Sequence, residues 1–255
     1  MTLNELDTYF RAFLKIEDFS RDVSLNGIQI QNSDPDSKQI KKIAFAVDAC
    51  AKTVQIAKEQ NADLLFVHHG IFWGGCERIV DNMYKRVAPF IKNDIALYAC
   101  HIPLDANNPY GNNYGLAARI GLKELEPFGE WRGMISGVKG KLEKPVTFPE
   151  LVKLSLNPGE KPFAELPFGK KEIQTVGIIS GGSGSDVVQA IEQGLDAYIS
   201  GDMEHALYHT VLESGINMIA LGHYQSETIG INLVREKVEK ELKIETVFID
   251  IPTGL

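Results

Sequence analysis

The sequence predicts an α/β fold built from two interlinked α/β domains with mainly parallel sheets. Apolar runs of four to six residues alternate along the chain with stretches of about ten residues that have helical spacing. Strands joined through helices form right-handed crossovers, which place consecutive strands parallel in one sheet. Three such strand–helix units occur in each half of the chain, although the two halves share little residue identity.

The elements follow in order along each half. The first twenty residues carry acids within an apolar pattern, which favours an amphipathic helix over a signal peptide. In the first half we then expect strands at 43–47, 64–67 and 95–99 and helices at 51–60, 82–92 and 114–120. In the second half we expect strands at 175–180, 197–200, 217–221 and 246–249 and helices at 186–193, 204–214 and 228–242.

The segment 123–171 differs from the rest of the chain because it is richer in glycine, proline and charge. Only an extra strand at 134–142 and a short helix at 148–154 are expected there. The boundary between the halves is placed in this segment, which gives domains of 1–125 and 126–255. No long linker or low-complexity tract separates them, so the halves are expected to pack together or to interlink as one unit.

Composition and charge narrow the classes of function. The formal net charge is −8, so the protein has no overall positive field to attract nucleic acid, which is not expected as a partner. No apolar run approaches the roughly 18 residues of a membrane span. Cys50, Cys76 and Cys100 show no CxxC spacing, which argues against a disulfide scaffold or a structural zinc site. A cytoplasmic protein is therefore expected, with Cys100 as an ordinary core residue.

Imidazole and carboxylate side chains gather where three of the apolar runs end. They are His68, His69 and Gly70 after the run ending at Val67, His101 and Asp105 after the run ending at Ala99, and His223 and Glu227 after the run ending at Leu221. Ligands of open α/β sheets bind beyond the carboxyl ends of the strands. Histidine nitrogen and bridging carboxylate oxygen form the ligand set of paired divalent transition metals. A metal site in the cleft between the two domains is the leading hypothesis.

Each of these groups has a chemical role and an ordinary alternative. Asp105 can bridge two ions with its two oxygens, or it can begin a turn. His101 is either a further ligand or a hydrogen-bond partner of one. His223 and Glu227 are four residues apart and can reach the same volume, or His223 can bond to backbone at a strand end. The adjacent histidines 68 and 69 need the bend that Gly70 permits, or each serves a different ion.

Two further features lie near predicted strand ends. Asp202 and His205 follow the strand at 197–200 and can hydrogen-bond to metal ligands, whereas His209 is expected on a solvated helix surface. The loop 181–185 has the sequence Gly-Gly-Ser-Gly-Ser and lacks the lysine of a P-loop. Its backbone amides either contact a phosphate or simply form a tight turn.

The ligand set predicts a reaction class. Two divalent ions beside two carboxylates would leave the site positively charged, which favours an anionic small molecule such as a phosphate or nucleotide. Bound metal would also lower the pKa of a water molecule towards about 7, so metal-dependent hydrolysis follows. The alternative is a non-catalytic metal-binding or regulatory scaffold. The missing substrate signature favours that alternative, as do Phe72 and Trp73 beside the histidine pair.

The sequence resembles the GTP cyclohydrolase I type 2 (GTP cyclohydrolase 1 type 2 homolog) family, also called the Nif-three-like family, from residue 1 to 255. The segments that carry the resemblance are Asn26-Gly27-Ile28-Gln29, Ala46-Val47-Asp48-Ala49, His68-His69-Gly70, His101-Ile102-Pro103-Leu104-Asp105 and Gly222-His223-Tyr224-Gln225-Ser226-Glu227. The resemblance implies two interlinked α/β domains, a dinuclear metal centre in the cleft and a ring-shaped (toroidal) homohexamer. The middle of this chain is too short for the inserted third domain of many members.

The resemblance also implies which residues hold the metals. The implied ligands are His68, His69, Asp105, His223 and Glu227. It makes His101 a hydrogen-bond partner of a ligand, and it leaves the region of Asp202 to His209 without assigned ligands. The implied cofactor is two divalent ions per chain, with Zn, Fe, Mn and Ni all compatible with imidazole and carboxylate donors.

Overall fold

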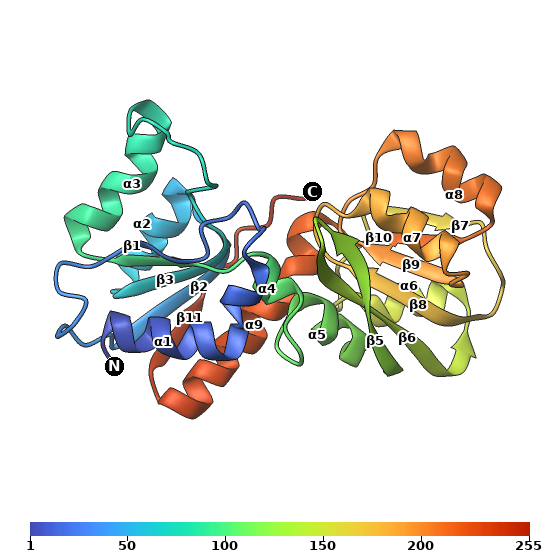
Figure 1. The fold of residues 1–255 in the computed structure, drawn as a ribbon, viewed down its shortest axis with the longest axis horizontal. Helices are drawn as coiled ribbons and strands as arrows, with labels where there is room; N and C mark the ends of the chain where they lie inside the picture. The colour runs from blue at the N-terminus through green and yellow to red at the C-terminus, as the bar shows by residue number, and fades with distance from the viewer. The chain divides into compact units, whose positions relative to one another are not determined.

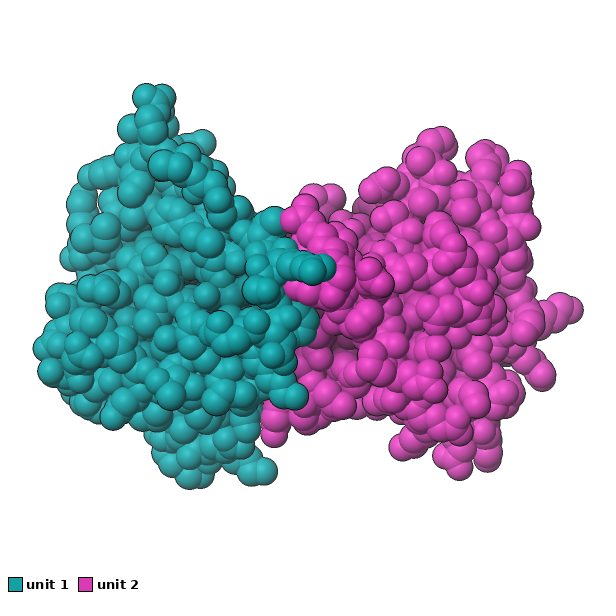
Figure 2. Space-filling model, viewed as in Figure 1, with its two compact units in different colours: residues 1–104, 231–251 teal, residues 105–230, 252–255 magenta.

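Strands and helices alternate along the chain, and the strands form two sheets, which confirms the α/β class (Figure 1). The computed structural model describes residues 1–255, which divide into two compact units (Figure 2). Unit 1 comprises Met1–Leu104 and Ile231–Ile251, and unit 2 comprises Asp105–Gly230 and Pro252–Leu255. The chain passes between the units at three points, so the units are interlinked in sequence.

This division differs from the one expected at 125/126. Helix α4 (Ile102–Asp105) ends on the first residue of unit 2. Helix α9 (His223–Leu242) gives its first eight residues to unit 2 and the others to unit 1. The composition of 123–171 is distinctive because much of it forms a long hairpin within unit 2, and the chain leaves unit 1 before that segment begins.

Unit 1 is built on a five-stranded sheet of order β1-β4-β3-β2-β11, in which only β1 is antiparallel to its neighbour. Its strands are β1 (Gly27–Ile30), β2 (Lys42–Asp48), β3 (Leu64–His69), β4 (Ala96–Ala99) and β11 (Glu245–Phe248). Its helices, besides part of α9, are α1 (Leu3–Leu14), η1 (Ile16–Phe19), α2 (Ala51–Glu59) and α3 (Asp81–Asn93). Helix α1 begins with a capping box formed by Thr2 and Glu5.

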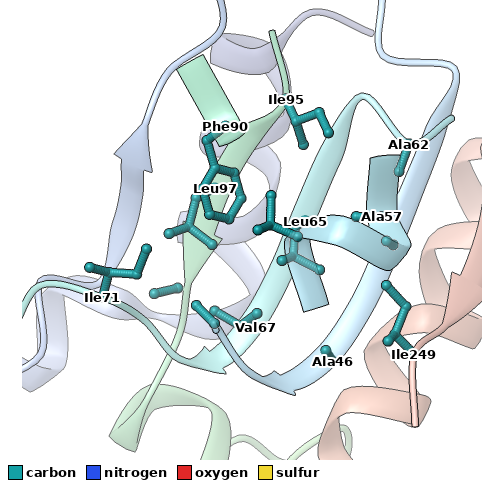
Figure 3. Close-up of a cluster of buried hydrophobic side chains, with 14 of the residues drawn as sticks. Ala46, Ala57, Ala62, Leu65, Val67, Ile71, Phe90, Ile95, Leu97 and Ile249 are labelled. Carbon is teal, nitrogen blue, oxygen red and sulfur yellow. The ribbon is translucent and has the colours of Figure 1, made fainter. Parts of the chain in front are cut away.

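Buried apolar side chains cover both faces of this sheet. On one face, Leu65 and Leu97 belong to a cluster that packs under α2 and α3 (Figure 3). On the other face, Phe10 of α1 packs against Phe66 and Tyr98 with ring centroids 4.9 Å away in both pairs. Successive strand residues point to opposite faces, so a strand buried on both sides appears as a continuous apolar run. This is why β2, β3 and β4 could be predicted.

Unit 2 contains a six-stranded sheet of order β5-β6-β8-β9-β10-β7. The pairs β8–β9 and β9–β10 are parallel, whereas β5–β6, β6–β8 and β7–β10 are antiparallel, so the expectation of a mainly parallel sheet holds for unit 1 and not for unit 2. Its strands are β5 (Leu122–Trp131), β6 (Met134–Val146), β7 (Ala164–Pro167), β8 (Ile173–Ile179), β9 (Ala197–Ser200) and β10 (Asn217–Ala220). Its helices, besides part of α9, are α5 (Asn112–Arg119), α6 (Phe148–Ser155), η2 (Gly184–Asp186), α7 (Val187–Glu192), η3 (His205–Leu207) and α8 (Tyr208–Ser214).

The structure adds three strands and corrects one helix. Strands β1, β5 and β7 all lie at sheet edges, and β5 has five consecutive exposed residues at 123–127, so no apolar pattern marks it. The prediction that the last helix starts at Thr228 is wrong, because α9 begins at His223. Three residues of the first turn, His, Tyr and Ser, have only middling helix propensity, so the sequence pattern does not mark it.

None of the helices combines the length and the apolar character that a membrane span requires. The three cysteines are free thiols, and Cys100 is fully buried, as expected for a core residue.

Asp196 connects the turn before β9 to the start of β8. Its carboxylate accepts hydrogen bonds from the backbone N–H groups of Gln174 and Thr175, both at 3.0 Å, and pairs with Lys170. Burial alone would raise the pKa of Asp196, but these donors outweigh burial and hold the pKa below its usual value.

We expect Asp196→Ala to lower the free energy of unfolding by about 1–3 kcal/mol near neutral pH, because two backbone donors lose their acceptor. A lowered folded-state pKa gives stability that is present above the unfolded-state pKa and is lost as pH falls through the folded-state pKa. The difference from wild type should therefore shrink in acid. Urea denaturation at neutral and acidic pH measures it. The control Lys170→Ala, which removes only an exposed partner, should cost less than about 1 kcal/mol.

Candidate metal centre

Three imidazoles gather at the carboxyl ends of β3 and β4 in unit 1. His68 and His69 are the last residues of β3, and His101 follows the neighbouring strand β4. The ring centroids are 4.6 Å apart for His68 and His69, 5.1 Å for His68 and His101, and 5.7 Å for His69 and His101. One ligand nitrogen from each ring lies within 4.8 Å of the other two. The three side chains can therefore hold a metal ion, and the geometry admits His101 as a ligand.

In each of these imidazoles, Nδ1 bonds to an oxygen. The partners are the carbonyl oxygen of Cys100 for His68 at 2.9 Å, Asp48 Oδ1 for His69 at 2.8 Å, and Asp22 Oδ1 for His101 at 2.9 Å. Carbonyl and carboxylate oxygens only accept hydrogen bonds, so Nδ1 must carry the proton and Nε2 the lone pair. Metal-binding histidines are usually oriented in this way, with Nε2 as the ligand atom.

Asp22 and Asn26, which precede β1, fix the position of His101. The Asp22 side chain has no exposed surface, and its carboxylate accepts hydrogen bonds from Asn26 Nδ2 and from the backbone N–H groups of Ser24 and Ile102. Asn26 Oδ1 in turn accepts the backbone N–H of His101 at 2.7 Å. Burial would raise the pKa of Asp22, but its donors, His101 first among them, lower that pKa overall. Asp22 is therefore a carboxylate near neutral pH.

Gln29, on β1, fixes the chain that follows His69. Its Oε1 accepts the backbone N–H groups of Ile71 at 2.7 Å and Phe72 at 3.0 Å, and its Nε2 donates to two backbone carbonyls. A Cβ at Gly70 would overlap the Gln29 amide, so this close approach requires glycine. No bend at Gly70 is needed to bring the two imidazoles together, since both histidines lie in β3, and Gln29 holds the chain that follows from β1.

In unit 2, Asp105, His223 and Glu227 form a second cluster. Because α9 starts at His223, His223 and Glu227 lie on one helix face, with His223 Nε2 3.2 Å from Glu227 Oε1. Carboxylate oxygens of Asp105 and Glu227 lie within 4.8 Å of each other. These two side chains are almost fully buried, with exposed fractions of 5% and 2%. Two buried carboxylates this close repel each other unless cations compensate their charge, so the cluster fits a cation.

Asp202 lies next to His223, and its Oδ2 is 2.8 Å from His223 Nδ1. Burial would lower the pKa of His223, but Glu227 and Asp202 together raise that pKa to about 10. Asp202 therefore orients the imidazole of His223 through Nδ1, as Asp48 orients that of His69. Both carboxylates hold a proton on Nδ1.

Asp105 is held in a fixed orientation by two neutral donors. Asn112 Nδ2 and Ser180 Oγ both donate to Asp105 Oδ1 at 2.8 Å. Asn112 is fully buried, and its own Oδ1 accepts the backbone N–H of Gly230 at 2.7 Å. Asn112 therefore links Asp105 to the end of the unit 2 part of α9.

We expect Asn112→Ala to weaken binding of divalent metal about 10–100-fold, because loss of a hydrogen bond to a ligating group typically has an effect of this size. Equilibrium dialysis with Mn²⁺ measures the affinity, and thermal unfolding shows whether the variant is folded. Asn157→Ala, which alters an exposed asparagine beyond α6, is the matched control. A folded Asn112→Ala variant with wild-type affinity would contradict the role of Asn112.

The loop 181–185 packs against the unit 2 cluster. A Cβ at Gly181, where φ is +64°, would overlap Glu227 Oε1, and one at Gly182 would lie 3.5 Å from His223 Cε1. Tyr198 of β9 holds the loop in place, because its hydroxyl donates a hydrogen bond to the Ser183 carbonyl at 2.7 Å. Glycine is therefore needed at position 181 to bring the backbone close to Glu227, whereas a Cβ at Gly182 would make only an ordinary contact.

The structure does not bring the last two histidines to either cluster. His205 begins η3 and is exposed, and its side chain makes no hydrogen bond or ion pair. His209 is exposed on α8, as expected, and its ring contacts Tyr208 at 5.4 Å.

Sequence reasoning missed the residues that hold the candidate ligands in place. These residues are Asp22, Asn26, Gln29, Asp48, Asn112 and Ser180. Only Asn26, Gln29 and Asp48 stood in segments that the sequence analysis had singled out, and there only for their resemblance to a family. Ser180 ends an expected strand, whereas the other five lie outside every helix and strand expected from the sequence.

Comparison with known proteins places the chain in a family. Residues 1–254 match the family described as Duf34/NIF3 (NGG1p interacting factor 3). The GTP cyclohydrolase 1 type 2 homolog of Treponema pallidum is 43% identical over 289 aligned positions, which cover the whole of both chains. The protein of the same name from Archaeoglobus fulgidus is 40% identical over 255 positions, again covering both chains completely.

Solved structures show the same fold. The crystal structure of TTHA1606 from Thermus thermophilus superposes with a TM-score of 0.89 at 32% identity and covers 100% of both chains. Protein ybgI, described as of unknown function, superposes with a TM-score of 0.88 at 31% identity and also covers 100% of both chains. Sequence and fold agree over the full length, and the chain belongs to the Duf34/NIF3 family.

Proposed function

We propose that this protein binds two divalent transition-metal ions per chain and hydrolyses a nucleotide or another phosphorylated small molecule. The observation that carries the proposal is shared by four histidines, His68, His69, His101 and His223. In each, Nδ1 bonds to an oxygen that can only accept, which leaves Nε2 as the nitrogen able to bind a metal. Four buried or half-buried imidazoles oriented alike are difficult to explain by packing alone. The free cysteines agree with a cytoplasmic location.

The proposed ligands are His68, His69, Asp105, His223 and Glu227. The unit 1 imidazoles are neutral donors, whereas the unit 2 cluster adds two carboxylates that would compensate the charge of bound ions. Asp105 would hold an ion in a fixed position, because Asn112 and Ser180 orient its carboxylate by donating to Oδ1. Membership of the family supports the same assignment.

Bound divalent ions supply the Lewis acidity that makes water a nucleophile near neutral pH. The residues of the chain orient the candidate ligands and shield them from water. Asp48 and Asp202 hold protons on His69 Nδ1 and His223 Nδ1, so that Nε2 is the nitrogen of each ring that binds a metal ion. The burial of Asp105 and Glu227 keeps bulk water from competing for their oxygens. Two divalent ions beside these two carboxylates leave a positive site on an acidic protein, which favours an anionic substrate.

The test combines elemental analysis with a substrate screen. Untagged protein purified without chelator should contain about two divalent metal ions per chain. The metal-loaded protein is then incubated with nucleotides and phosphorylated sugars, and the products are separated by chromatography. Hydrolysis that disappears in Asp105→Ala supports the proposal. If no turnover depends on Asp105, the protein is not a hydrolase of this kind.

A second candidate function is a non-catalytic metal-binding or regulatory scaffold that assembles as a ring-shaped homohexamer. Exposed apolar side chains on α3 and the loop before it favour this function, since Ile79, Val80 and Tyr84 are 50%, 47% and 50% exposed. Light scattering coupled to gel filtration tests for the hexamer. Recovery of a stoichiometric partner by both wild type and Glu227→Ala, with no effect of the substitution in cells, would favour the scaffold over the hydrolase.

A further inference from the structure

An indole ring lies beside the imidazoles of unit 1. The centroid of the Trp73 ring is 5.0 Å from that of His101 and 5.9 Å from that of His69. The indole meets His101 edge to face, with an interplanar angle of 77°. Trp73 thus adds a large aromatic ring next to the imidazoles of unit 1.

This ring is held in place by the chain around it. Trp73 Nε1–H donates to the carbonyl of Gly70 at 3.1 Å, so the polar edge of the indole is satisfied locally. The two residues before Trp73 are fixed by Gln29, which accepts both of their backbone N–H groups. A side chain that is already ordered loses little conformational freedom when a ligand binds to it.

Trp73 is also accessible. Its exposed fraction is 38%, and the next two residues, Gly74 and Gly75, carry no side chain. A Cβ added at Gly75 would meet no atom within 4 Å. An anchored indole with an open surface next to candidate metal ligands is suited to contact a flat ligand.

We propose that Trp73 is a stacking platform for a planar heteroaromatic ring such as a nucleobase, so that the ligand of this site combines such a ring with an anionic group. The proposal deepens the proposed function and rests on it for the anionic group, which the metal ions would attract. Stacking on an aromatic side chain is tolerant of base identity because every base has a π face. Trp73 therefore selects nucleotides over phosphorylated sugars without choosing between bases.

The chain offers a convenient spectroscopic design, because Trp131 is the only other tryptophan. It lies at the end of β5, where Arg132 stacks on its ring at 4.5 Å. In Trp131→Phe, all indole fluorescence comes from Trp73. We expect GMP and AMP to quench this fluorescence saturably and ribose 5-phosphate to leave it unchanged.

Calorimetric titration of the variants completes the test. Trp73→Leu should weaken GMP binding at least about fivefold, the lower end of what loss of one base-stacking side chain produces. It should change ribose 5-phosphate binding less than about twofold, and Trp73→Phe should restore most of the GMP affinity. Equal losses for GMP and ribose 5-phosphate, or unchanged GMP binding, would overturn the proposal and leave Trp73 as a cover over the imidazoles.

The outcome is separable from that of the proposed hydrolase, because binding and quenching require no turnover. If metal is bound and GMP binding does not depend on Trp73, the stacking proposal falls and the metal proposal stands. If GMP stacks on Trp73 but no turnover depends on Asp105, the hydrolase proposal falls and the stacking proposal stands.

Discussion

His69→Ala is expected to reduce the bound divalent metal from about two ions per chain to one or fewer, while the protein stays folded. His69 is the last residue of β3, and its side chain is 19% exposed, so its removal leaves no large buried cavity. The substitution takes away a proposed nitrogen ligand outright. Its effect on affinity should therefore exceed the roughly 10–100-fold loss that follows removal of a ligand's hydrogen-bond partner. Elemental analysis and competition with a chelator measure it.

Two further variants make the result interpretable. Asp48→Asn keeps the shape of the partner of His69 but removes its charge, and we expect it to weaken metal binding by about 10–100-fold. His209→Ala removes an exposed histidine on α8 and should leave metal content unchanged. The expected order of metal affinity is wild type, then Asp48→Asn, then His69→Ala. A His69→Ala protein with full metal content would show that His69 is not a ligand.

The candidate ligands could be located from sequence because burial and strand order leave a strong pattern. The run Leu64–Val67 is apolar throughout because both faces of β3 are covered, so the polar pair that follows stands out. The same holds for His101 after β4. In a parallel sheet, neighbouring strands end at the same edge, which brings His68 and His101 together without any long-range information.

The residues that orient those ligands could not be located in this way. Asp22 reaches His101 across 79 positions of sequence, and Asp48 reaches His69 across 21. Asp22 lies in a turn, where no periodicity distinguishes a buried carboxylate with four donors from a solvated one. Only tertiary structure distinguishes them, because two of the donors, His101 and Ile102, come from a segment distant in sequence.

The start of α9 shows the same limit at short range. Helical spacing is clear from Thr228 onwards, but the first turn carries no apolar periodicity and begins after Gly222, which has φ of +104°. Starting the helix at His223 changes the chemistry, because it places His223 and Glu227 on one face and within hydrogen-bonding distance. His223 and Glu227 could be predicted as candidate ligands, whereas the contact between their side chains could not.

The contact between His223 and Glu227 leads to a second large effect, on the pH dependence of metal binding. In the metal-free protein, burial opposes protonation of His223, but Glu227 and Asp202 raise its pKa to about 10. Near pH 7 the imidazole is therefore protonated, and a metal ion must displace that proton to bind Nε2. Affinity should rise about tenfold per pH unit between pH 7 and 9, with release of about one proton per chain from His223.

The same shift has a consequence for stability. A folded-state pKa raised above the unfolded-state value of about 6.5 contributes stability that is fully present below pH 6.5. This stability is lost as pH rises towards 10. The metal-free protein should therefore become easier to unfold between pH 7 and 10, and saturating metal should remove this dependence, because the ion replaces the proton as the partner of Glu227.

Glu227→Gln and Asp202→Asn test the cause. Each removes one carboxylate from His223, so each should lower the pKa of His223 towards its usual value and reduce proton release near neutral pH. NMR titration of the imidazole resonances in metal-free protein measures the pKa directly, with exposed His209 as an internal reference. Calorimetry in buffers of different ionisation enthalpy counts the protons released on metal binding. A pKa of His223 close to the ordinary histidine value of about 6.5 in the wild type would contradict the coupling of His223 with Glu227 and Asp202.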